Sequence, residues 1–155
     1  MNTFKYDKQR HLELLKLKSS QDTILTHLEK SELKEYACIL ESAINWEVKE
    51  QYLQMLENLI SGKISSLQFY NKFMKRTELT NNAYDSLIAN FVLLSPHEKS
   101  EGFSQFLVDI ISSCVAYENI FDLDISEEER NSYNLNLRNE MEETYLEIQE
   151  FLKEG

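Results

Sequence analysis

The most constraining feature of the sequence is residues 52–76, which read YLQMLENLISGKISSLQFYNKFMKR. The first half places apolar side chains at helical spacing, and Gly62 then stands where a left-handed residue commonly ends a helix. Ser65 and Gln68 have the spacing of a capping box, so a second helix is predicted to begin there. About four residues connect the two helices, and we expect an antiparallel helical hairpin. The second helix has an aromatic-rich face, formed by Leu67, Phe69, Tyr70, Phe73 and Met74.

Glycine and proline are scarce, with three Gly and one Pro in 155 residues. This composition excludes folds built on glycine-rich phosphate loops and leaves little material for tight β-hairpins. No stretch alternates polar and apolar residues with period two. A chain of this length buries a sufficient core without disulfides or metals. We predict an all-α fold, a single-domain helical bundle over residues 1–155 with about six or seven helices, in which residues 1–30 form the least defined part, an N-terminal helical arm.

In the first half of the chain, helix-capping residues and polar runs predict where helices begin and end. The polar residues 18–22 predict a break within the N-terminal arm. Ser31 is a favourable N-cap, and apolar residues at helical spacing follow it over residues 33–44. We expect a boundary near Trp46, with the indole packed over the joint between this helix and the hairpin.

Two further start signals follow the hairpin. Thr80, within the polar residues 77–82, is predicted to cap a helix that ends at Ser95 and Pro96. The same dipeptide, with Glu98 three residues after the serine, is predicted to begin the next helix.

That next helix carries the most apolar face of the chain, and we place it at the centre of the core. Gly102 lies inside it, which favours a bend or a close approach of another helix. The face consists of Phe103, Phe106, Leu107, Ile110, Ile111 and Cys114. Residues 117–125 then form a connector, whose Ile120, Phe121 and Leu123 we expect to lie under the core.

The chain ends in a long helix of about 25 residues. Ser126 and Glu129 have capping-box spacing at its start, and acidic residues occupy its first turn. One apolar stripe runs along it, formed by Tyr133, Leu137, Met141, Tyr145, Ile148 and Leu152. The other faces are mostly acidic.

Cysteine and histidine usage indicates no redox or metal chemistry. Cys38 and Cys114 lie in apolar helical patterns and are predicted to be buried, reduced thiols.

The N-terminus has no apolar core of secretory length, and no apolar run in the sequence is long enough to span a membrane. We therefore expect a soluble, cytoplasmic protein without a cofactor. No histidine follows a glutamate by three residues, so no di-iron type metal site is predicted.

No pattern indicates catalysis or nucleic-acid binding. The sequence lacks a nucleophile on a strained turn and paired carboxylates within an apolar segment, so an enzyme is not predicted. Lys72, Lys75 and Arg76 lie near Tyr70 and Phe73, a combination that single-stranded nucleic acid uses, but a solvated face over core aromatics is the simpler interpretation.

Acidic residues concentrate at the C-terminal end. The net charge is −11, and residues 118–155 contain 12 acidic against 3 basic residues. Such a field opposes binding to nucleic acid or anionic lipid and favours a basic protein partner, although it also serves plain solubility. The candidate partner-binding residues are Asp122, Asp124, Glu127, Glu128, Glu142, Glu143 and Glu147.

The hairpin stretch resembles the opening of the colicin-D-like immunity family. The matching residues are Ile60, Ser61, Gly62, Ile64, Ser65, Phe69 and Phe73. The resemblance implies a small helical bundle that binds and silences a tRNA-cleaving toxin domain, with an acidic surface in place of the tRNA backbone. It assigns the matching residues to the fold and implies a basic nuclease domain as partner.

A second resemblance covers more of the chain. The stretches LESAINWEVKEQY, FVLLSPHEKSEGFSQFL and ETYLEIQEFL are similar to uncharacterised reading frames of algal plastid genomes. This likeness implies the plastid stroma and carries over no role. The alternative to an immunity protein is a structural or assembly subunit of a larger plastid complex, held by an apolar patch that includes Trp46, Tyr70, Tyr84 or Phe121. A third alternative, an enzyme, requires a deep pocket with perturbed carboxylates or histidines.

Overall fold

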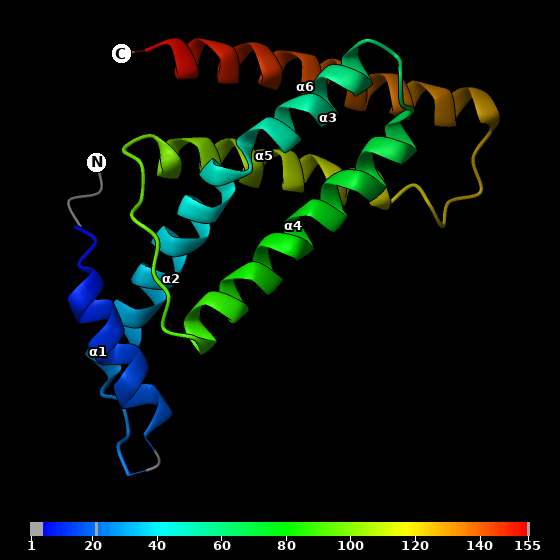
Figure 1. The fold of residues 1–155 in the computed structure, drawn as a ribbon. Helices are drawn as coiled ribbons and strands as arrows, with labels where there is room; N and C mark the ends of the chain where they lie inside the picture. The colour runs from blue at the N-terminus through cyan, green and yellow to red at the C-terminus, as the bar shows by residue number, and fades with distance from the viewer. Residues whose placement is uncertain (1–4, 21, 155) are drawn as a thin grey trace.

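The structure is a computed structural model that describes residues 5–20 and 22–154, and within these ranges it contains six helices and no strand (Figure 1). The helices are α1 (Lys8–Ser19), α2 (His27–Glu47), α3 (Lys49–Ile60), α4 (Ser66–Ala89), α5 (Ser100–Glu118) and α6 (Glu127–Lys153). The predicted all-α fold with a long C-terminal helix is confirmed.

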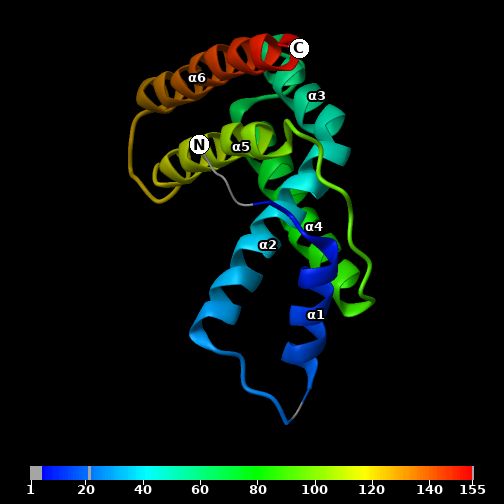
Figure 2. The same ribbon diagram turned by 90° about the vertical axis from the view of Figure 1, so that its left-hand side faces the viewer.

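The helices pack in sequence along the length of the molecule, from α6 at one end to α1 and the α1–α2 connection at the other. α3 and α4 make the hairpin, and α6 lies over α3 and α5. α5 packs between α2 and α6, while α1 packs against α2. Both ribbon views place α6 at one end and the α1–α2 connection at the opposite end (Figures 1 and 2).

The hairpin turn forms as the local signals predict. Gly62 has φ of 81°, in the left-handed region. The amides of Gly62 and Lys63 donate to the carbonyls of Leu59 (3.1 Å) and Asn58 (2.9 Å), which is the Schellman pattern. Ser65 and Gln68 then form a complete capping box at the start of α4.

The main core joins α3, α4, α5 and α6. Phe69, Phe73, Phe103, Ile110 and Ile148 are fully buried in it, which confirms the central position of α5. The predicted close approach at Gly102 is also present, because a Cβ atom there would lie only 2.6 Å from Cζ of Phe151. The glycine therefore permits α5 and α6 to pack tightly.

A second, smaller apolar group lies between α1 and α2. This N-terminal cluster consists of the buried Leu14, Leu15, Leu33, Tyr36 and Ile39, with Tyr6, Leu25, Ile88 and Leu93 partly buried around it. A two-bond ion pair links the helices, since Nε and Nη2 of Arg10 donate to the carboxylate of Glu32 at 2.9 and 3.0 Å. The predicted break after α1 is confirmed, except that Gln21 lies outside the described residues.

The predicted joint near Trp46 is confirmed. Val48 alone separates α2 from α3. The Trp46 indole stacks on the ring of His97 with centroids 4.3 Å apart and meets Phe103 edge-on at 6.0 Å. The exposed His97 thus covers the joint.

Two predicted helix starts and one predicted helix end are wrong. α2 begins four residues before Ser31, with Thr26 in a full capping box. Thr80 lies inside an unbroken α4, buried, with its hydroxyl 3.4 Å from that of Tyr52. Packing against α2 and α3 therefore outweighs the local polar signal. α4 ends at Ala89, before the predicted Ser95 and Pro96.

α5 begins at Ser100 rather than at Pro96, because local bonds around His97 form a separate turn. Nδ1 of His97 accepts from the amide of Lys99 (3.0 Å), and the hydroxyl of Ser100 donates to the carbonyl of His97 (2.7 Å). At the start of α6, Ser126 accepts from the amide of Glu129 (3.1 Å), but the glutamate side chain does not complete the predicted box.

Some burial predictions are also wrong. Cys114 is buried as predicted, whereas Cys38 is exposed on α2. In the connector, Ile120 lies in the core, but Phe121 and Leu123 are exposed. Leu67 in the first turn of α4 is exposed as well, because it lies on the side of the helix away from Phe69 and Phe73.

Candidate functional site

All seven predicted partner-binding acids are exposed. None of them forms an ion pair with a residue in the described parts of the chain. They fall into two groups, which we call the first acidic cluster and the second acidic cluster. The first consists of Asp122, Asp124, Glu127 and Glu128, in the connector and the first turn of α6. The second consists of Glu142, Glu143 and Glu147, in the second half of α6.

The acids do not form one continuous row with one-turn spacing. At 1.5 Å per helical residue, Glu128 and Glu142 are about 21 Å apart along the axis. The intervening part of α6 carries Arg130 and Arg138, and Nη2 of Arg138 donates to the carbonyl of Ile60 at 2.6 Å. The structure therefore presents two separate negative surfaces.

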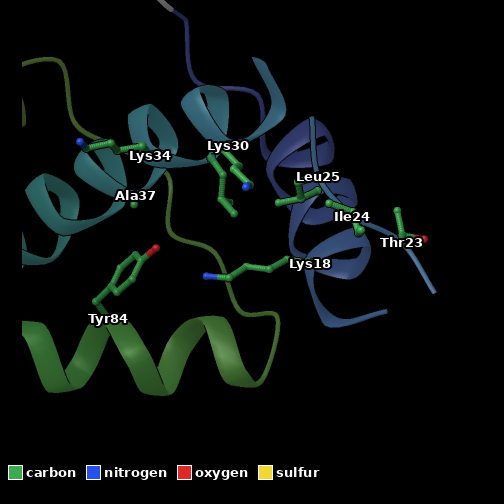
Figure 3. A pocket seen from close by; sticks show the side chains of 9 residues that line it. Lys18, Thr23, Ile24, Leu25, Lys30, Lys34, Ala37 and Tyr84 are labelled. Atoms are coloured by element: carbon green, nitrogen blue, oxygen red, sulfur yellow. The ribbon is translucent and has the colours of Figure 1, made fainter. Parts of the chain in front are cut away.

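A pocket rimmed by lysines lies beside the α1–α2 connection (Figure 3), which is at the end of the molecule away from α6 (Figure 1). This lysine pocket has a volume of about 580 Å³ and is bounded by the end of α1, the α1–α2 connection, α2 and Tyr84 of α4. Its lining residues are Lys18, Thr23, Ile24, Leu25, Lys30, Leu33, Lys34, Ala37 and Tyr84. Sequence analysis missed it, since only the packing of α1 and α4 around α2 brings residues 18 and 84 together.

A more polar cleft of about 430 Å³ lies among α2, α3, α4 and α5. Its polar lining is Cys38, Glu41, Ser42, Asn45, Tyr52, Thr77, Thr80, Asn81 and Ser104. The Tyr52 hydroxyl donates to Oδ1 of Asn45, whose Nδ2 donates to the hydroxyl of Ser104, both at 3.3 Å. This network links three helices across the floor of the cleft.

The polar cleft contains a perturbed carboxylate but no activated nucleophile. Burial, and then the nearby charge of Asp85, raise the pKa of Glu41. Burial, followed by Glu41 and Glu35, also raises the pKa of the Cys38 thiol, which keeps it protonated and poorly nucleophilic. The cleft has the perturbed carboxylate that the enzyme alternative requires, but its lining includes no histidine to act as a base for the thiol.

The described residues provide no metal site or membrane span. No three or more His, Cys, Asp or Glu side chains in residues 5–20 and 22–154 gather closely enough to hold a metal ion. Within the same ranges, no helix combines the length and the apolar character needed to cross a bilayer.

Comparison with protein-family models, with curated proteins and with solved structures finds no match to this chain.

Proposed function

We propose that this protein is a stoichiometric protein-binding module whose two acidic clusters contact a basic partner. The observation that carries the proposal is that all seven carboxylates are exposed and without an ion pair to any described residue. α6 holds eight glutamates against two arginines and one lysine, so little positive charge on the helix compensates them. Such a surface favours fast and selective association with a positively charged protein.

The arrangement supports binding at two points. The clusters are about 21 Å apart along the α6 axis, so a partner that contacts both presents basic groups at a similar separation. Leu135 (55 % exposed) and Leu146 (59 % exposed) lie on the same helix and offer apolar contact area beside the charges.

The finer proposal, which rests on the resemblance of the hairpin stretch, is an immunity protein that inhibits a colicin-type tRNase domain. The clusters would occupy the basic groove that otherwise holds RNA phosphates, and inhibition would follow from occlusion. In keeping with a structural role for the matching residues, Gly62 and Ser65 form the hairpin turn, and Phe69 and Phe73 lie in the main core.

The alternative of a structural subunit in a plastid complex has less support. The four aromatic residues that would mark its apolar patch lie in three places. Trp46 covers the α2–α3 joint, and Tyr84 lines the lysine pocket. Tyr70 and Phe121 pack edge-on with ring centroids 5.1 Å apart, just beyond the C-terminal end of α5. The cytoplasm and the plastid stroma both stay predictions.

The test begins with affinity capture by the tagged protein from an extract of its own cells, at low and then at high salt. The bound protein is identified by mass, purified, and used to measure association kinetics. We expect a basic nuclease domain that is lost at high salt. We also expect E142Q/E143Q/E147Q to slow association and flatten its salt dependence.

The matched control is E78Q/E98Q/D109N, which removes the same charge from exposed positions on α4, the α4–α5 connection and α5. It should leave the association rate close to that of the unmodified protein. Equal effects of both triple variants, or partners that survive high salt and bind all variants alike, would overturn the proposal.

A further inference from the structure

The lysine pocket concentrates positive charge in an acidic protein. Lys18, Lys30 and Lys34 are exposed, and none of them pairs with a carboxylate in the described parts of the chain. Arg10, on the same pair of helices, differs because the carboxylate of Glu32 binds it through two hydrogen bonds. The three lysine charges are therefore available to an anion from outside the protein.

Apolar side chains form the floor and part of the rim of the same pocket. Leu33 is buried, and Leu25 and Ala37 are half-buried. Ile24 at the rim is 89 % exposed, and the neighbouring Leu28 is 77 % exposed. Covering this surface with an apolar group is favourable. The volume of about 580 Å³ lies within the range of roughly 300–1,000 Å³ typical of small-molecule sites.

The polar groups of the pocket converge between α2 and α4. In Figure 3 the amine of Lys18 and the hydroxyl of Tyr84 point into this space, and the amine of Lys30 faces it from α2. Burial raises the pKa of Tyr84, and the carboxylates of Glu41 and Asp85 raise it further. The phenol therefore stays protonated at neutral pH and is able to donate a hydrogen bond.

The same two carboxylates define where a negative head group fits. Glu41 lies on α2 and Asp85 on α4, both act electrostatically on Tyr84, and their charges repel an anion beside its hydroxyl. The favourable position is nearer to Lys18 and Lys30, with the apolar body of the ligand over Leu25 and Leu33.

We propose that the lysine pocket binds a single small anionic amphiphile of the fatty-acid type, with its carboxylate between Lys18 and Lys30 and its alkyl chain on the apolar floor. A monomeric ligand fits better than a lipid bilayer, because the net charge of −11 repels an anionic membrane surface. The α1–α2 connection, which lines the pocket, and α6 lie at opposite ends of the molecule (Figures 1 and 2), so this site does not depend on the partner proposed for the acidic clusters.

Calorimetric titration of the full chain with dodecanoate, below its micelle concentration, tests the proposal. We expect saturable binding of one molecule per chain. K18Q/K30Q should bind about tenfold more weakly or worse, because it removes charge-assisted hydrogen bonds to the head group. K63Q/K72Q changes two exposed lysines elsewhere and should bind as the unmodified protein does. Ala37→Phe, which fills the floor, should abolish binding while circular dichroism shows an unchanged helical fold.

Five outcomes would overturn the proposal. Three concern dodecanoate: the unmodified protein does not bind it, K18Q/K30Q binds it as tightly as the unmodified protein does, or K63Q/K72Q loses as much affinity as K18Q/K30Q. In the fourth, the uncharged dodecyl maltoside binds as tightly as dodecanoate. In the fifth, the protein binds only to phosphatidylglycerol vesicles. The last two would assign the surface to general apolar contact or to membrane adsorption.

Discussion

His11 is a buried titratable ring in the N-terminal cluster. Its side chain is fully buried, and its Nδ1 lies 2.9 Å from the hydroxyl of Tyr6. The ring stacks on Tyr36 with centroids 5.3 Å apart, and Nε2 has no hydrogen-bond partner among residues 5–20 and 22–154. Burial lowers the pKa of His11 below its ordinary value of 6.5. The folded protein thus disfavours the charged imidazolium.

We expect this histidine to make stability depend on pH. Between the lowered pKa of the folded state and 6.5, the unfolded chain binds the proton more readily, so stability is full above this window and falls as the pH drops through it. Glu32 stays ionised in the window because Arg10 holds its pKa below 4.5, and Tyr6 stays neutral with a pKa raised to about 12.

Urea denaturation at about pH 7.5 and about pH 5.5 measures the effect. The unmodified protein should lose more stability on acidification than His11→Phe, which keeps an aromatic ring beside Tyr36 but cannot titrate. Equal losses in the two proteins would contradict the assignment.

The two cysteines should differ in reactivity. Cys38 is exposed, although burial of its sulfur raises the thiol pKa and slows its reaction. Cys114 is buried, which raises its pKa to about 12. With a disulfide reagent at mildly alkaline pH, we expect one thiol per folded chain to react and the second only in denaturant. Cys38→Ser should leave no reactive thiol in the folded state; rapid reaction in that variant would contradict the burial of Cys114.

At the scale of helices, local sequence signals predict a helix boundary correctly where a single residue determines the backbone conformation. Gly62 and Ser65 are such positions, and the hairpin forms as expected. Ser31 and Thr80 are also good caps in isolation, yet both lie inside helices. An earlier cap, Thr26, starts α2, and packing of α4 against α2 and α3 keeps the buried Thr80 inside an unbroken helix. These outcomes depend on packing between helices that one sequence window does not contain.

The corrected start of α2 leads to a direct test. Thr26→Ala removes the hydroxyl that accepts from the amide of Glu29 at 3.1 Å, and we expect a loss of about 1 kcal/mol. Ser31→Ala, at the originally predicted cap, should change the free energy of unfolding by less than about 0.5 kcal/mol, since it lies on an exposed part of the helix. Urea denaturation compares the two, and a larger effect at Ser31 would favour the original prediction.

The contact between α5 and α6 depends on the absence of a side chain at residue 102. Gly102→Val forces the new atoms against the ring of Phe151, and we expect a loss of roughly 1–3 kcal/mol from overpacking. In a Phe151→Ala background the same substitution should cost less, because the ring is gone. The coupling follows from a double-mutant cycle of thermal or urea unfolding, and strict additivity would show that the two residues do not interact.

At the scale of the whole molecule, the two apolar groups differ in size. The main core joins four helices, whereas the N-terminal cluster depends chiefly on the contact of α1 with α2. Fewer buried side chains imply a lower free energy of local opening. We therefore expect the amides of α1 to exchange with deuterium faster than those of α5. Glu32→Gln, which weakens the ion pair with Arg10, should further accelerate amide exchange in α1 and leave amide exchange in α5 unchanged. Equal protection of α1 and α5 would show that the molecule opens only as one unit.

The candidate sites also differ in how well the sequence predicts them. Exposure of the seven acids follows from their charge and needs no knowledge of packing. Their separation into two clusters follows from their positions in the long helix α6, because Glu128 and Glu142 lie about 21 Å apart along its axis. The lysine pocket requires residue 84 of α4 to lie beside the end of α1, and no local pattern predicts that contact.

The uneven placement of charge gives the molecule a large electric dipole moment. Residues 1–50 are close to neutral, with 9 acidic and 8 basic residues, whereas residues 118–155 carry 12 and 3. Because α6 and the α1–α2 connection lie at opposite ends, the negative pole coincides with the acidic clusters (Figure 1). An external field therefore exerts a torque on the whole protein. As it approaches a positively charged surface, the molecule rotates until α6 faces that surface, before any side chain makes contact.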